Sequence, residues 1–161
     1  MTTPTSNKLS EFFTWDEVTR SDTAARYGIR NDIPFELIPV IKYTAGMMDK
    51  VRAHLGKPVH INSWLRCLEL NRVLLSKDTS DHIRGLAVDF TCPSFGTPLA
   101  ICKELLHHQQ NYQWKQLILE YTWVHISFYL PDEIRKPPET LTLLANKEYA
   151  LGLTDKYGNV V

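Results

Sequence analysis

The sequence predicts an α+β fold in which helices pack on a mainly antiparallel sheet. Segments with the three- and four-residue apolar spacing of helices gather early in the chain, and short alternating segments gather late. A chain of 161 residues can bury one core without disulfides or other staples. We therefore expect a single domain over residues 1–161, with residues 1–10 flexible and residues from about 131 to 161 forming a C-terminal extension.

The predicted helices begin and end at local signals. Thr14 and Glu17 form a capping box, and Gly28 and Gly56 are suited to helix ends. The longest helix carries one apolar face, which is typical of packing on a core. The expected helices cover residues 14–20, 21–27, 35–54, 68–75 and 99–108.

The predicted strands alternate apolar and polar side chains. They cover residues 58–63, 86–91, 115–120 and 123–129, with an edge strand at 140–144 and a tail after it. If Tyr121 and Thr122 form a two-residue connection, Ile118 pairs with His125. Glu120 then lies on the same face of the sheet, as the diagonal neighbour of His125.

Composition excludes several classes of protein. The 18 basic and 18 acidic residues cancel, which argues against a nucleic-acid partner bound through a general basic field. The start of the chain does not resemble a signal peptide, and no apolar run approaches the length of a membrane span. We expect a monomer without a membrane partner, made in a cytoplasm. Its three cysteines are expected as free thiols, with Cys92 and Cys102 buried.

Three residues form a candidate zinc site. His82 and Asp89 lie seven residues apart with Gly85 between them, and His125 follows in a later strand. Two imidazoles, one carboxylate and a water make up a catalytic zinc site, whose bound water has a lowered pKa. Asp89 on an apolar strand needs either a cation or a cluster of hydrogen-bond donors, and spacing alone leaves both possibilities open.

The remaining histidines are expected to be structural. His60, His107 and His108 carry no pattern that indicates metal binding. His54 lies near a predicted helix end, where a histidine is typically a solvated cap or a partner of the helix dipole.

At these residues the chain resembles the M15 group of zinc peptidases, which includes D-alanyl-D-alanine carboxypeptidases, related dipeptidases and bacteriophage endolysins. The two strongest likenesses are Ser80-x-His82-x-x-Gly85-x-Ala87-x-Asp89 and Trp123-Val124-His125-Ile126-Ser127. Asn62-Ser63-Trp64-Leu65-Arg66 is similar to a turn of the family, and Phe13-Thr14 with residues 21–28 is similar to the opening of phage-type members. The likeness covers roughly residues 12–130 and implies a hedgehog/D,D-peptidase-like fold.

The resemblance also implies roles for individual residues. It implies one zinc ion held by His82, Asp89 and His125, with Arg66 binding a substrate oxygen and stabilising the oxyanion. It implies that Ser80 and Ser63 contact the substrate. Many members carry the catalytic carboxylate at the position of Thr122, which cannot act as a base. Glu120 resembles the arrangement of phage-type members and is the expected base, with Asp81 as the alternative.

The expected function is hydrolysis of peptide bonds in peptidoglycan stem peptides, by water bound to zinc and a glutamate base. The protein is then a phage lysin that reaches the cell wall after release, or a virion-associated hydrolase. The bond is left open between a D-Ala-D-Ala terminus, an L-Ala-D-Glu link and a D-Ala-diaminopimelate crosslink. Two alternatives are a non-catalytic zinc-containing module that binds the wall and a cytoplasmic D,D-dipeptidase.

Overall fold

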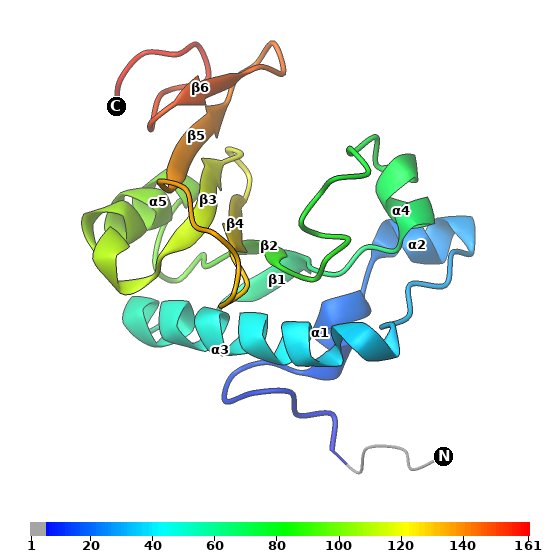
Figure 1. Cartoon of the computed structure of the whole chain (residues 1–161). Coiled ribbons are helices and arrows are strands. Elements are labelled where there is room, and N and C mark those ends of the chain that lie inside the picture. Colours follow the sequence, from blue (N-terminus) through cyan, green and yellow to red (C-terminus); the bar gives the residue numbers. More distant parts are fainter. Residues whose placement is uncertain (1–5) are drawn as a thin grey trace.

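Helical and strand segments assemble as the apolar pattern predicts. The computed structural model describes residues 6–161 and packs the helices on one six-stranded sheet (Figure 1). The helices are α1 (Trp15–Thr19), α2 (Asp22–Tyr27), η1 (Phe35–Leu37), α3 (Ile38–Leu55), α4 (Leu68–Val73), α5 (Pro98–His107) and η2 (Gln109–Asn111). The strands are β1 (His60–Ser63), β2 (Ala87–Thr91), β3 (Trp114–Leu119), β4 (Val124–Phe128), β5 (Glu139–Leu143) and β6 (Tyr149–Leu151).

The predicted helix signals are confirmed. Thr14 and Glu17 make the capping box of α1, and the Ser21 side chain accepts a hydrogen bond from the backbone of Ala24 at the start of α2. Gly28 and Gly56 end α2 and α3 with φ angles of 65° and 63°, a conformation that glycine adopts without a steric penalty.

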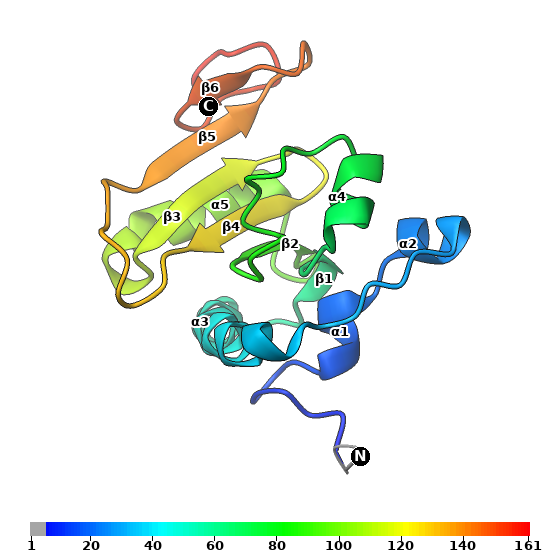
Figure 2. The same ribbon diagram turned by 45° about the vertical axis from the view of Figure 1, so that its right-hand side comes forward.

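The sheet has the strand order β1-β2-β4-β3-β5-β6. Every pairing is antiparallel except that of β3 with β5, so the predicted mainly antiparallel sheet is confirmed. Figure 2 shows β3, β4 and β5 side by side with α5 behind β3 and β4.

The two longest helices cover one face of the sheet. Met48 of α3 and Leu105 of α5 are fully buried in the core with Val88 of β2 and Ile126 of β4. Side chains alternate along a strand, so the neighbours Asp89 and His125 lie on the opposite face. The helix layer therefore leaves this second face available for a site.

The C-terminal residues extend the sheet. The predicted edge strand is present as β5, but it is not at the edge, because β6 pairs with it. The expectation of a tail after residue 144 is therefore wrong for β6, a short and largely exposed strand with no clear alternation in sequence.

The start of the chain is attached to the helix layer. Residues 1–5 of the predicted flexible start lie outside the described residues. The Asn7 carbonyl accepts a hydrogen bond from the backbone N–H of Trp15 (2.9 Å), and the Ser10 hydroxyl lies 2.8 Å from Asp49 of α3. Within residues 6–161, no helix has the length and apolar character needed to cross a membrane.

Candidate active site

A row of side chains crosses the sheet at the level of Asp89. Asp89 of β2 is the direct cross-strand partner of Ser63 on β1 and of His125 on β4. His125 in turn pairs with Ile118 of β3, which pairs with Leu141 of β5. Cross-strand partners point to the same face of a sheet, so the register alone brings these five side chains into one line.

His82 reaches the end of this row from the loop before β2. Its Nδ1 lies 2.7 Å from the carbonyl oxygen of Trp64, and its ring centroid is 5.1 Å from that of His125. The loop turns at Gly85, whose φ of +73° is strained for any other residue. A Cβ at this position would lie 2.6 Å from Cδ1 of Ile41, so the glycine also permits close packing on α3.

Three groups converge on the Asp89 carboxylate. His125 Nδ1 lies 2.8 Å from Oδ1, His82 Nε2 lies 3.2 Å from Oδ2, and the Arg66 guanidinium donates to Oδ2 over 2.8 Å. Burial by itself would raise the pKa of Asp89, but the two histidines hold it well below its usual range. The carboxylate is therefore ionised at neutral pH, as a metal ligand must be.

The predicted zinc ligands fit a metal ion. One nitrogen from each of His82 and His125 and one oxygen of Asp89 lie within 4.8 Å of one another. Burial lowers the pKa of His82, which favours the neutral imidazole that binds metals. The Trp64 carbonyl occupies Nδ1 of His82 and leaves Nε2 towards Asp89, a usual way of orienting a metal-binding histidine.

Glu120 lies beside these residues, as the predicted register requires. Ile118 pairs with His125, and the backbone N–H of Glu120 donates to the Trp123 carbonyl over 3.1 Å, so the two-residue connection is confirmed. Tyr121 adopts a φ of 59° in this connection, where the sequence lacks the usual glycine. Its hydroxyl donates to the carbonyl oxygen of Thr154 and so ties the turn to the C-terminal residues.

The Glu120 side chain has properties of a general base. Among residues 6–161 it makes no side-chain hydrogen bond or ion pair, whereas the Asp89 carboxylate is fully engaged. Burial raises the pKa of Glu120, and the negative charge of Asp89 raises it further, against the opposing effects of His125 and Arg66. A half-buried carboxylate with a raised pKa is a better proton acceptor than an exposed one.

Neighbouring side chains of the site hold the Arg66 guanidinium in place. Its Nε donates to the Ser63 hydroxyl over 2.9 Å, and its other contacts are Asp89 and, more distantly, the Ser76 hydroxyl at 3.4 Å. A guanidinium has five N–H groups, so two remain for a ligand. Sequence reasoning did not identify Asp89 as the partner of Arg66.

The other two predicted residues lie at the same site in different roles. The Ser80 hydroxyl accepts a hydrogen bond from the backbone N–H of His82 over 3.3 Å, which is a loop-capping contact. Asp81, the alternative base, is buried and paired with Arg84 (3.1 Å) and Lys115 (2.9 Å). Asp81 is therefore already engaged by two cations, whereas Glu120 makes no side-chain ion pair among residues 6–161.

The site residues that the sequence predicted, with the exception of Ser63, line a groove of about 790 Å³. Its wall contains further residues that sequence reasoning missed, namely Ser76, Lys77, Lys115, Gln116, Leu141 and Tyr149. Leu141 and Tyr149 belong to the C-terminal extension, for which the sequence offered no likeness. The pairing of β5 with β3 is the feature that brings them to the groove.

A pair of histidines, a buried carboxylate and a free glutamate in one groove are the elements of a metal-dependent hydrolase. The comparison with protein families agrees: the sequence matches the peptidase M15 family over residues 11–127, and the chain belongs to this family of metallopeptidases. M15 peptidases are in general zinc-dependent. No curated protein gives a significant match to this sequence.

Proposed function

We propose that this protein is a zinc peptidase that hydrolyses peptide bonds in peptidoglycan stem peptides. The observation that carries this proposal is the position of Glu120, a carboxylate with no side-chain partner among residues 6–161, in the groove that also contains His82, Asp89 and His125. The three clustered residues are the proposed zinc ligands, and Glu120 is the proposed base. A module that only bound the wall would have no need for a half-buried carboxylate without a partner, since such a group is costly to desolvate.

Individual residues of this chain have distinct roles in the proposed peptide hydrolysis. Zinc, when bound, supplies a Lewis acid that polarises the scissile carbonyl and activates water. Glu120 accepts the proton of the attacking water, a transfer that its raised pKa favours, and then returns the proton to the leaving amine. Arg66 directs its two remaining N–H groups to a substrate oxygen, while its contact with Asp89 fixes the guanidinium in place.

The groove suits a substrate larger than a free dipeptide. Its volume of about 790 Å³ extends from the loop of Lys77 to Tyr149 of β6, well beyond the metal cluster. Of the cations that line it, Arg66 and Lys115 are paired with Asp89 and Asp81. Among the described residues Lys77 forms no ion pair, so it is the cation best placed to attract a carboxylate of a stem peptide. We propose a phage lysin or a virion-associated hydrolase as the biological setting, with a cytoplasmic D,D-dipeptidase as the alternative.

Mass spectrometry of the products tests the reaction. Purified peptidoglycan is incubated with the protein, and the released muropeptides are identified, which also names the bond that is cut. Free D-Ala-D-Ala is tested in parallel. Cleavage of the dipeptide alone would favour the dipeptidase, and the absence of any cleavage by zinc-loaded protein would favour the wall-binding module.

Glu120→Gln tests the assignment of the base. We expect zinc to stay bound and turnover to fall by roughly 10²–10⁴-fold, because removal of a general base costs about that factor. Glu36→Gln is the matched control, because Glu36 is exposed on η1 and should retain full activity. Full activity in Glu120→Gln would show that another group takes the proton.

A further inference from the structure

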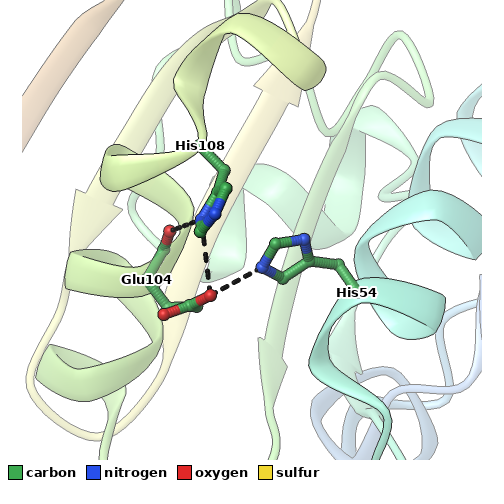
Figure 3. Close-up of side chains that lie close together, drawn as sticks. All are labelled: His54, Glu104 and His108. Carbon is green, nitrogen blue, oxygen red and sulfur yellow. Dashed lines mark hydrogen bonds and ion pairs between the residues drawn. The ribbon is translucent and has the colours of Figure 1, made fainter.

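A second cluster of metal-binding side chains lies between the ends of α3 and α5 (Figure 3). His54 belongs to the last turn of α3, and Glu104 and His108 lie one turn apart at the end of α5. Oε1 of Glu104 lies 2.7 Å from Nε2 of His54 and 3.3 Å from Nδ1 of His108. Both imidazoles therefore face the same carboxylate oxygen.

This cluster is separate from the proposed catalytic groove. The core faces of α3 and α5 pack on the side of the sheet that carries Val88 and Ile126, whereas Asp89 and His125 lie on the other side. None of the three residues of the cluster lines the groove. A ligand bound at the cluster would therefore not touch a substrate in the groove.

We propose that His54, Glu104 and His108 form a second binding site for a divalent transition-metal ion, with zinc as the favoured ion. Two imidazoles and one carboxylate are a common set of zinc ligands, and they suit other first-row ions as well. One nitrogen from each histidine and one Glu104 oxygen lie within 4.8 Å of one another. Ligands about 2.1 Å from a tetrahedral zinc ion lie roughly 3.4 Å apart, so binding requires only small movements of these side chains.

The surroundings favour a cation. Both helices direct their C-terminal ends towards the cluster, and the partial negative charge of a helix C-terminus stabilises positive charge nearby. The rings are held in place: His108 Nδ1 lies 3.1 Å from the Glu104 carbonyl oxygen, and Tyr112 packs edge-on against His54 at 5.7 Å between centroids.

The cluster is open to solvent on one side. The side chains of His54, Glu104 and His108 are 21%, 36% and 32% exposed, so a hydrated ion can reach them and keep a water as a fourth ligand. An ion bound here joins the end of α3 to the end of α5. We infer a stabilising role, because a ligand that binds only the folded state raises its stability.

Metal stoichiometry distinguishes this site from the proposed catalytic site. Tag-free wild-type, Glu104→Gln and His125→Ala proteins are dialysed against micromolar ZnCl2, and bound zinc is measured by mass spectrometry. We expect two ions in the wild type and one in each variant. His60→Ala is the matched control, because His60 is exposed on β1 away from both clusters, and it should bind two.

The alternative outcomes separate the two proposals. One ion in the wild type and in Glu104→Gln, with none in His125→Ala, would overturn the second site and leave the proposed function intact. One ion in the wild type, retained in His125→Ala and lost in Glu104→Gln, would support the second site and contradict the proposed catalytic ligands. Circular dichroism verifies that each variant is folded, and His54→Ala repeats the test with a different ligand.

Thermal unfolding supplies a second readout. In the His125→Ala background, a zinc concentration a hundredfold above the Kd should raise Tm by roughly 5–10 °C. Adding Glu104→Gln in the same background should abolish this increase. An equal increase in both proteins would overturn the second site.

Discussion

At the scale of the residue, the Asp89 carboxylate stands out because three side chains converge on it. The sequence left two ways of satisfying it, a cation or a cluster of hydrogen-bond donors, and the structure supplies donors from His82, His125 and Arg66. The two histidines were predicted from their place in the family motifs, from the spacing of His82 to Asp89 and from the strand that carries His125. The contact between Arg66 and Asp89 was not predicted, because these residues are 23 positions apart and meet only through the fold of an irregular loop.

Removal of the Asp89 carboxylate should destabilise the fold as well as the metal site. In Asp89→Ala the largely buried Arg66 guanidinium loses its partner, and an uncompensated buried charge costs about 3–5 kcal/mol. Urea unfolding in the presence of a chelator measures this loss without a contribution from metal. Asp78→Ala, which breaks an exposed pair with Arg72, should leave the free energy of unfolding nearly unchanged. Equal small losses in both variants would contradict the predicted role of Arg66.

At the scale of the element, the amphipathic helices and the central strands were predictable. Helix α3 buries Ile41, Ala45, Met48 and Val51, which recur at the spacing that the sequence shows. Strand β6 was missed because three residues are too few to show an alternating pattern, and β5 is its neighbour in the sheet. The buried positions of Cys92 and Cys102 are confirmed, with Cys67 half-buried, and all three are free thiols.

The Cys102 thiol in helix α5 should make the free energy of unfolding decrease at high pH. Burial raises the pKa of the Cys102 thiol to about 12, from the ordinary value of 9.0. The folded state therefore keeps a proton that the unfolded state loses above pH 9. The stabilisation is fully present below pH 9 and is lost as pH rises towards 12, by about 1.4 kcal/mol for each pH unit. Urea unfolding of wild type and Cys102→Ala between pH 8 and 11 should show a shallower decline in the variant, and parallel declines would refute the assignment.

At the scale of the whole molecule, the C-terminal extension completes the groove. The family match ends at residue 127, yet Leu141 of β5 and Tyr149 of β6 line the same groove as the proposed zinc ligands. Burial raises the pKa of the Tyr149 hydroxyl, and the carboxylates of Glu120 and Asp89 raise it further. No local sequence pattern predicts this part of the groove wall, because it depends on the parallel pairing of β5 with β3 in the assembled sheet.

Tyr149 should affect substrate binding more than the chemical step. Tyr149→Ala is expected to raise KM several-fold and leave kcat within a few-fold of the wild type, because the ring supplies groove wall rather than a proton acceptor. Tyr157→Ala is the matched control, since Tyr157 is an exposed aromatic residue of the same extension that does not line the groove. Unchanged kinetics in Tyr149→Ala would place the substrate elsewhere in the groove.

The second cluster, His54, Glu104 and His108, could not be predicted from the sequence. Glu104 and His108 are one helical turn apart, but that spacing is common on solvated helix faces. His54 joins them only because α3 and α5 pack with their C-terminal ends together, and this contact spans 50 residues of sequence.

The row of cross-strand partners from Ser63 to Leu141 also bears on how the protein matures. Its members come from five strands, and those strands are neighbours in the sheet in a different order from that in which they are synthesised. The β1–β2 pair holds Ser63 and Asp89, and the β3–β4 pair holds Ile118 and His125. Only the pairing of β2 with β4, which are separated in sequence by α5 and β3, places Asp89 beside His125. Peptide cleavage, measured during refolding, should therefore report the pairing of β2 with β4 rather than the formation of any one strand.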